Sequence, residues 1–266
     1  MDIMQTIILA IIEGITEFLP VSSTGHMILA SSVMGIHGEA FVKTFEIAIQ
    51  LGAIGAIVML YYKRFLRGID IYLKLGAAFL PTAIVGFLAY KTIKLYLFNP
   101  LGVSLALAVG GVILILIDKS VIARKSEHGE LESLSFQHAF LIGLAQCVSM
   151  IPGVSRAAAT IIGGVYNGLD KKQATEFSFL LAVPTMCAAT GYDLMKTDAA
   201  LSPHGLVLLA VGFVVAFISA WLAVKVFLKF VENHGFRYFG YYRILIGVAF
   251  ILYMVWSGSA SLLESL

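Results

Sequence analysis

Six stretches of this chain are long and apolar enough to cross a lipid bilayer, and they constrain the fold more than any other feature. They cover about residues 45–62, 72–90, 100–118, 174–195, 205–230 and 240–257. A membrane-spanning helix needs about 20 predominantly apolar residues. Only 13% of the 266 residues are charged, against about 25% in soluble domains. The sequence therefore predicts an all-α integral membrane protein with six transmembrane helices, forming a single membrane domain over residues 1–266.

Two further apolar stretches, 3–35 and 135–168, are each interrupted by a polar segment that contains proline. The interruptions leave arms of about 13 to 17 residues, which are short for a membrane crossing. Irregular backbone at membrane depth is tolerated only where protein or a water-filled cavity satisfies it. We therefore expect two re-entrant helix hairpins whose tips share one polar cavity.

The chain also resembles itself after a shift of 132 residues. The shift places Pro20 on Pro152, Ser23 on Ser155 and Phe45 on Phe177. Each copy, about 1–118 and about 135–257, contains one hairpin followed by three spans. Because three is an odd number, the second copy must be inverted, as in many transporters.

The distribution of Lys and Arg predicts the orientation. Thirteen of the 18 fall on one side of the predicted spans, Arg243 among them, and the side rich in these residues is normally cytoplasmic. Both termini and the entry of the first hairpin are then outside, and the second hairpin enters from the cytoplasm. The net charge of +2 without a basic tract excludes a nucleic-acid partner.

The first predicted tip carries groups suited to catalysis. Glu13 and Glu17 share one face of a helix, where two buried carboxylates repel unless one is protonated or a cation lies between them. This favours a metal site or a general acid and base. Ser22, Ser23 and Thr24 precede His26, so a hydroxyl nucleophile with an imidazole base is one interpretation. Helix capping and a buried, hydrogen-bonded histidine form the other.

The second predicted tip carries Arg156, between Ser155 and a good helix start that contains Thr160. A guanidinium beside helix N–H groups favours a phosphate clamp, and a structural counter-ion to the carboxylates is the alternative. Three polar residues follow the hairpins and are predicted either to support the site or to hold helices together: Glu46, Gln50 and Glu176.

The polar motifs of this sequence resemble those of the undecaprenyl-diphosphate phosphatase family of the bacitracin-resistance type. The segments that carry the resemblance are EGITEFLPVSSTGH at 13–26, Phe45-Glu46 with Gln50, PGVSR at 152–156 and EFSFLLAVP at 176–184. The resemblance implies a hydrolase of the bacterial inner membrane that removes the terminal phosphate of undecaprenyl diphosphate. Its lipid product is reused in peptidoglycan synthesis, which maintains cell shape, and the activity confers bacitracin resistance. A homodimer is left open.

The resemblance also implies roles for individual residues. Glu13 and Glu17 form the acidic pair, which would bind Mg²⁺ or Ca²⁺, and Ser23 and His26 supply the hydroxyl and the imidazole. Phosphate would be bound by Arg156 with Ser155 and Thr160. We also expect the hydroxyl groups of Ser22 and Thr24, beside Ser23, to contact the phosphate. The family usually has serine directly after the arginine, where Ala157 stands here, so we expect one fewer contact to phosphate.

Two questions stay open at this point, which are the class of the protein and the identity of the nucleophile. A transporter or flippase of polyprenyl phosphate would also use inverted repeats with paired tips. The membrane acid-phosphatase superfamily uses similar Ser-Gly-His and Ser-Arg segments, but the histidine and aspartate expected after the arginine are missing here. The nucleophile is Ser23, His26 or water, with the active site expected to face the outer side of the membrane.

Overall fold

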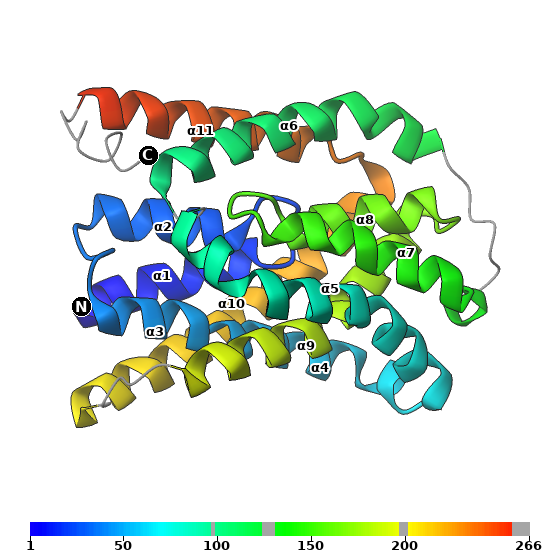
Figure 1. The fold of residues 1–266 in the computed structure, drawn as a ribbon, viewed down its shortest axis with the longest axis horizontal. Helices are drawn as coiled ribbons and strands as arrows, with labels where there is room; N and C mark the ends of the chain where they lie inside the picture. Colours follow the sequence, from blue (N-terminus) through cyan, green and yellow to red (C-terminus); the bar gives the residue numbers. More distant parts are fainter. Residues whose placement is uncertain (97–98, 124–130, 197–201, 257–266) are drawn as a thin grey trace.

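The computed structural model describes residues 1–96, 99–123, 131–196 and 202–256, and within these ranges the chain is helical, with no strand (Figure 1). The α-helices are α1 (Ile3–Thr16), α2 (Ser23–Val33), α3 (Ala40–Ala48), α4 (Gln50–Phe65), α5 (Ile69–Tyr96), α6 (Pro100–Ala123), α7 (Phe136–Cys147), α8 (Arg156–Tyr166), α9 (Lys171–Met195), α10 (Pro203–Asn233) and α11 (Arg237–Trp256). Two short 3-10 helices, Leu131–Ser133 and Val148–Met150, flank α7.

Six helical segments of the described ranges are long and apolar enough to span a membrane, which confirms the predicted number. They are Ala40–Phe65, Ile69–Ala89, Pro100–Lys119, Lys171–Met195, Pro203–Asn233 and Arg237–Trp256. Four of these segments contain the whole of a predicted span. The second and the sixth contain all but the last residue of theirs, which are residues 90 and 257. Arg124 and Lys125, counted among the predicted cytoplasmic cations, lie outside the described residues.

The two interrupted apolar stretches form pairs of short helices, as their proline-containing segments predict. Helices α1 and α2 extend from one end of the molecule, and α7 and α8 extend from the opposite end (Figure 1). The loop between α1 and α2 and the loop between α7 and α8 meet near the middle of the bundle. This arrangement brings the polar residues of both loops together.

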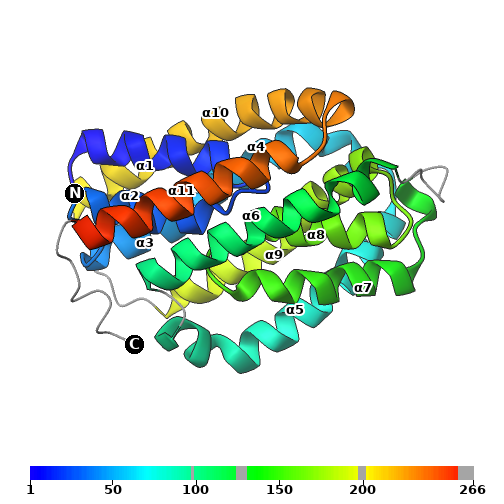
Figure 2. The ribbon, with the colours of Figure 1, turned by 90° about the horizontal axis from the view of Figure 1, so that it is seen from above.

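The short pairs are held by close packing against long helices. Helix α1 lies along α10 and α7 lies along α5, at opposite edges of the bundle in Figure 2. Helices α6 and α11 pack together along the top of the bundle in Figure 1. A Cβ atom at Gly14 would lie 2.5 Å from the carbonyl oxygen of Ala216, and one at Gly143 would lie 2.1 Å from that of Ala78. Such contacts are possible only without a side chain, as is common where membrane helices pack closely.

Apolar side chains cover the outside of the bundle as well as its core. Leu88, Leu116 and Val226 are 69–77% exposed on three of the spanning helices. A soluble protein rarely exposes so much contiguous apolar surface, whereas lipid covers it at no cost. Inside, Phe18 and Phe179 pack edge to face with ring centroids 5.5 Å apart, beneath the meeting point of the two loops.

Candidate active site

The two loops contact each other directly. The Ser155 hydroxyl donates a hydrogen bond to the Leu19 carbonyl oxygen (3.3 Å), and a Cβ atom at Gly25 would lie 3.6 Å from Cα of Gly153. Gly153 has a φ of +92°, in the left-handed region that favours glycine. The resulting turn lets the second loop approach the start of α2 closely.

Arg243, on α11, links the two loops to each other and to α6. Its guanidinium is 1% exposed and donates to the carbonyl oxygens of Pro20 (3.1 Å), in the first loop, and Gly153 (2.8 Å), in the second. Two further bonds reach carbonyl oxygens of α6, at Ala106 and Leu107. The prediction that Arg243 belongs to the cation-rich membrane face was therefore wrong, because four carbonyl groups satisfy this charge inside the protein.

Two helix N-termini point their unsatisfied N–H groups toward this junction. Ser22 caps α2 and Ser155 caps α8, so that Ser23 and Arg156 are the first residues of the two helices. Ser22 has a φ of +70°, and it is the one residue other than glycine with a positive φ in the described ranges. Such strain is tolerated mainly where it serves a functional geometry. The helix N-termini together favour an anion.

A chain of hydrogen bonds links residues of the two loops. The Ser23 hydroxyl donates to Oε2 of Glu17, and Nη2 of Arg156 donates to Oε1 of the same carboxylate (3.0 Å). The carboxylate side chain is 5% exposed and the arginine side chain 11% exposed. A carboxylate placed between a hydroxyl and a guanidinium can accept the hydroxyl proton while the cation stabilises nearby negative charge.

Ser178 of α9 completes the arginine site, and the sequence interpretation missed it. Nη1 of Arg156 donates to its carbonyl oxygen (2.9 Å), and the Thr160 hydroxyl donates to its Oγ (2.6 Å). The internal repeat could have indicated Ser178, because the 132-residue shift that places Phe45 on Phe177 also places Glu46 on Ser178. Residues at this position of both repeats are polar within apolar helices.

Two polar groups at the junction are buried without any hydrogen-bond partner among the described residues. Both carboxylate oxygens of Glu13, which is 0% exposed, and Nε of Arg156 have none. Buried polar atoms without partners cost about 1–3 kcal/mol each, and more when charged. An unsatisfied cationic donor and an unsatisfied carboxylate in one region indicate a site whose remaining partners come from a ligand.

His26 is fixed by residues other than the expected serine. Its Nδ1 contacts the Ser22 carbonyl oxygen (2.8 Å), and its Nε2 contacts the Tyr242 hydroxyl (2.9 Å). The predicted pairing of His26 with the Ser23 hydroxyl is thus absent from this structure, where Glu17 takes that place. Tyr242, on α11, was also missed, since an aromatic residue near the end of a predicted span has an ordinary interfacial interpretation.

The remaining predicted phosphate ligands lie at or near the junction. The Ser22 and Ser155 side chains accept from backbone N–H groups of Gly25 and Ala158, so both cap helices. Capping was one of the two interpretations of Ser22, whereas it was not predicted for Ser155. Thr24 lines a cavity beside the loops, which is described in the next paragraph. The Thr160 hydroxyl lies within hydrogen-bonding distance of carbonyl oxygens of α8 and of the Ser178 hydroxyl.

A cavity of about 830 Å³ lies against the loop junction. Pro152, Gly153, Thr24, Glu46 and Gln50 line it together with mostly apolar side chains of α5 and α9. The side-chain amide oxygen Oε1 of Gln50 accepts from the Thr190 hydroxyl (3.4 Å). Two of the three predicted supporting residues therefore lie along this cavity, which is large enough for part of a lipid.

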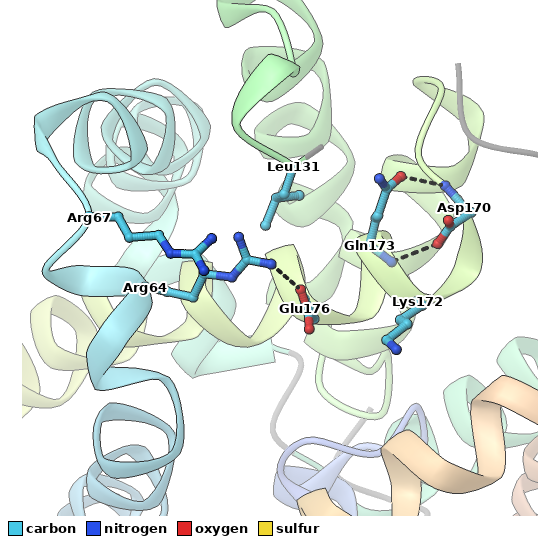
Figure 3. A pocket seen from close by; sticks show the side chains of 7 residues that line it. All are labelled: Arg64, Arg67, Leu131, Asp170, Lys172, Gln173 and Glu176. Atoms are coloured by element: carbon cyan, nitrogen blue, oxygen red, sulfur yellow. Dashed lines mark hydrogen bonds and ion pairs between the residues drawn. The ribbon is translucent and has the colours of Figure 1, made fainter. Parts of the chain in front are cut away.

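Glu176, the third predicted supporting residue, lies elsewhere. Its carboxylate accepts from Nη2 of Arg64 (3.3 Å) in a separate cavity between the end of α4 and the start of α9 (Figure 3). Residues two positions apart on a helix point in nearly opposite directions, so the helix face that presents Ser178 to Arg156 turns Glu176 away. Of the two interpretations of Glu176, this placement favours the second, in which the side chain holds helices together, here α4 and α9.

The acidic residues fit a metal ion only in part. Within the described ranges, no group of three or more His, Cys, Asp and Glu side chains is arranged to hold one. Glu13 has two free carboxylate oxygens, which suit a hard cation such as Mg²⁺ or Ca²⁺. The two carboxylate oxygens of Glu17 already accept hydrogen bonds from Ser23 and Arg156. To bind a metal ion as well, one of these oxygens would have to contact both the ion and its hydrogen-bond donor.

Taken together, the fold and the site define a multi-pass membrane protein with a buried polar centre between two helix-loop-helix pairs. The family model described as "Bacitracin resistance protein BacA" matches residues 6–249. The chain belongs to this family.

Curated relatives match over nearly their full length. The protein of Wolinella succinogenes named undecaprenyl-diphosphatase is 51% identical over 254 residues, which cover 96% of this chain and 99% of the relative. Proteins of the same name from Aquifex aeolicus and Bdellovibrio bacteriovorus are each 48% identical, over 94% and 97% of this chain and 98% of each relative. This agreement matches the family resemblance seen in the sequence motifs.

Proposed function

We propose that this protein hydrolyses undecaprenyl diphosphate to undecaprenyl phosphate and inorganic phosphate, and so recycles the lipid carrier for cell-wall synthesis. The names of the relatives support this activity. The observation that carries it in this chain is the buried Nε of Arg156, which has no partner among the described residues at a point where two helix N-termini meet. A diphosphate supplies the acceptor oxygens that this donor needs.

In the proposed complex, the diphosphate lies between the N-termini of α2 and α8. The guanidinium of Arg156 neutralises its charge and is held in place by Ser178 and Glu17. Phosphoryl transfer depends mainly on such positioning and charge stabilisation. The apolar cavity beside the loops would take the first part of the polyprenyl chain, with the remainder in the bilayer.

The chemical step then uses the hydrogen-bond chain at the junction. The Ser23 hydroxyl oxygen attacks the terminal phosphorus, its proton passes to Glu17, and the bond from that phosphorus to the bridging oxygen breaks. Undecaprenyl phosphate leaves with the bridging oxygen, and a phosphoserine remains. Water then attacks the phosphorus of the phosphoserine, the bond from phosphorus to the Ser23 oxygen breaks, and Glu17 returns its proton to that oxygen. Inorganic phosphate leaves with the oxygen and both protons of the water, so that the Ser23 hydroxyl and the Glu17 carboxylate are restored. His26, fixed by Tyr242, orients the start of α2.

A divalent cation would add to the charge stabilisation. Glu13 and Glu17 are the residues that would hold Mg²⁺ or Ca²⁺, and the unpartnered Glu13 carboxylate supports this assignment. When bound, the ion would neutralise charge on the diphosphate. The roles given above to Ser23 and Arg156 do not depend on it.

We also propose that the two pairs of short helices are re-entrant hairpins of an inverted repeat. Two observations support this: the order of two short elements followed by three spans occurs twice, and α1 packs on α10 as α7 packs on α5. With the cation-rich loops in the cytoplasm, the centre opens to the outer face of the membrane, and both termini are outside.

Phosphate release by the purified protein in detergent tests the proposed function. We expect release from undecaprenyl diphosphate by the wild type and none by Arg156→Ala, because the diphosphate loses the cation at the loop junction. Arg237→Ala is the matched control, since Arg237 is exposed at the start of α11. A folded wild-type protein that releases no phosphate would refute the enzyme and favour a carrier of polyprenyl phosphate.

A further inference from the structure

Glu46, on α3, lines the cavity of about 830 Å³ beside the loop junction. Its Oε1 atom is buried and has no hydrogen-bond partner among the described residues. The same holds for both carboxylate oxygens of Glu13, which is 0% exposed. We propose that Glu46 is a further ligand of a divalent cation bound at Glu13. The inference rests on the proposed function for the use of the ion, whereas binding of the ion can be measured without substrate.

The packing of α3 on α1 brings the helix faces of Glu46 and Glu13 together. Val42 and Ile49, which share a helix face with Glu46, belong to one buried apolar cluster with Leu9 of α1. Leu9 in turn shares a face with Glu13, one turn further along α1. Helices α1 and α3 contact each other at the end of the molecule that holds the N-terminus (Figure 1). The two carboxylates therefore lie on faces that pack together, close enough to repel each other's charge.

The charges around Glu13 favour a cation. Glu17 and Glu46 both repel its carboxylate, whereas Arg156 attracts it. The Arg156 guanidinium, however, donates its hydrogen bond to Glu17 (3.0 Å) and leaves both Glu13 oxygens without a donor. Buried carboxylates that repel one another are stabilised when one is protonated or when a cation lies between them. Unpartnered oxygens on two neighbouring carboxylates suit the second arrangement.

Glu46 keeps one oxygen available for such an ion. Ser31 and Lys43 interact with its carboxylate, yet Oε1 has no hydrogen-bond partner. Mg²⁺ is usually bound through one or two carboxylates, keeps several water ligands and contacts substrate phosphates. Two carboxylates and the adjoining cavity are therefore sufficient for it. With an oxygen supplied by Glu46, the ion does not require Glu17 to give up either of its hydrogen bonds.

The internal repeat also places Glu46 at the centre. The 132-residue shift places Arg156 on Thr24 and Ser178 on Glu46. In the second copy, the Ser178 carbonyl oxygen accepts from Arg156. In the first copy, the corresponding residues Thr24 and Glu46 line one cavity against the loop junction. This correspondence supports a role for Glu46 in the site rather than in helix packing alone.

Binding of Mn²⁺ to the full chain in detergent tests the proposal. Mn²⁺ prefers the same oxygen ligands as Mg²⁺, and its free concentration can be followed by electron paramagnetic resonance. We expect Glu46→Gln to raise the dissociation constant about tenfold or more, and Glu46→Asp, which keeps the charge, to restore part of the affinity. Glu176→Gln is the matched control, since Glu176 is a partly buried carboxylate of another spanning helix and pairs with Arg64 away from the junction.

A double variant tests whether the two carboxylates share one ion. If they do, Glu13→Gln with Glu46→Gln should lose no more affinity than the sum of the single losses allows, and less than that sum, because residues that bind one ligand together are not additive. Fully additive losses would indicate two separate sites and refute the shared ion. Equal melting temperatures of the metal-free proteins show that the variants are folded.

The remaining outcomes separate this proposal from the proposed function. Wild-type affinity in Glu46→Gln would overturn the assignment of Glu46. A wild type that binds no Mn²⁺ would also overturn it, and protonation of Glu13 would then relieve the repulsion. A wild type that binds Mn²⁺ through Glu46 but releases no phosphate from undecaprenyl diphosphate would support the cation site and refute the enzyme.

Discussion

Replacing Gly153 by alanine should damage the centre without removing any of its chemical groups. The added Cβ atom would lie 2.6 Å from the carbonyl oxygen of Val103 and 2.8 Å from Cβ of Ala106, so the loop must move away from α6. The φ of +92° adds strain for any residue but glycine. Strain and overpacking together should cost about 2–4 kcal/mol.

The loop carries Arg156 only three residues further along the chain, so displacement of the loop displaces the guanidinium. A shift of about 1 Å at a catalytic group lowers turnover by about 100-fold. We therefore expect kcat/KM for undecaprenyl diphosphate to fall by about that factor in Gly153→Ala, and the melting temperature in detergent, followed by tryptophan fluorescence, to fall as well.

Gly191→Ala provides the matched control. Gly191 lies within α9, and a Cβ atom there would have no atom within 4 Å. Alanine should stabilise this helix by up to about 1 kcal/mol and leave turnover unchanged. A Gly153→Ala protein with wild-type turnover and melting temperature would show that the close contact between the second loop and α6 does not position the centre.

Three further predictions follow from the same geometry. Glu17→Gln keeps the shape of the side chain but cannot accept the Ser23 proton, so kcat should fall by about 10²–10⁴ with little change in KM; a rate within twofold of the wild type would exclude Glu17 as the base. Arg243→Met leaves four buried carbonyl oxygens without their donor and should lower the melting temperature markedly, with partial recovery in Arg243→Lys; equal melting temperatures for the wild type and Arg243→Met would contradict the bridging role. A chelator should lower phosphate release by the wild type, and Glu13→Gln should abolish its restoration by Mg²⁺ or Ca²⁺; full restoration in Glu13→Gln would place the ion elsewhere.

The sequence predicts the helices well because the relevant signal is local. Apolar length identified the six spans, and Pro20 and Pro152 with their polar neighbours identified the two short pairs. Irregular, polar backbone cannot face lipid, so these segments had to lie where protein surrounds them. The same reasoning predicts that Glu17 and Arg156 share one polar cavity.

The partners of the centre depend on how helices rotate and pack, which local patterns do not determine. As an ionisable residue in an apolar helix, Glu176 was a candidate to support the site. In the structure, however, α9 directs Ser178 toward Arg156 and Glu176 toward Arg64. Arg243 has the sequence context of an interfacial cation, near the start of an apolar helix. Its burial follows from the tight packing of α11 on α6, where a Cβ atom at Gly240 would lie 2.7 Å from the Gly111 carbonyl oxygen.

The most direct test of the central claim is the rate of phosphate release from undecaprenyl diphosphate by the wild type and by Ser23→Ala, measured at saturating substrate. Ser23 is buried and its hydroxyl bonds to Glu17, so removing this hydroxyl leaves the binding groups in place while it removes the proposed nucleophile. We predict that the wild type releases one phosphate per lipid and that Ser23→Ala, folded and still able to bind the substrate, releases none above background. Wild-type release by Ser23→Ala would contradict the mechanism and assign the attack to water or to His26.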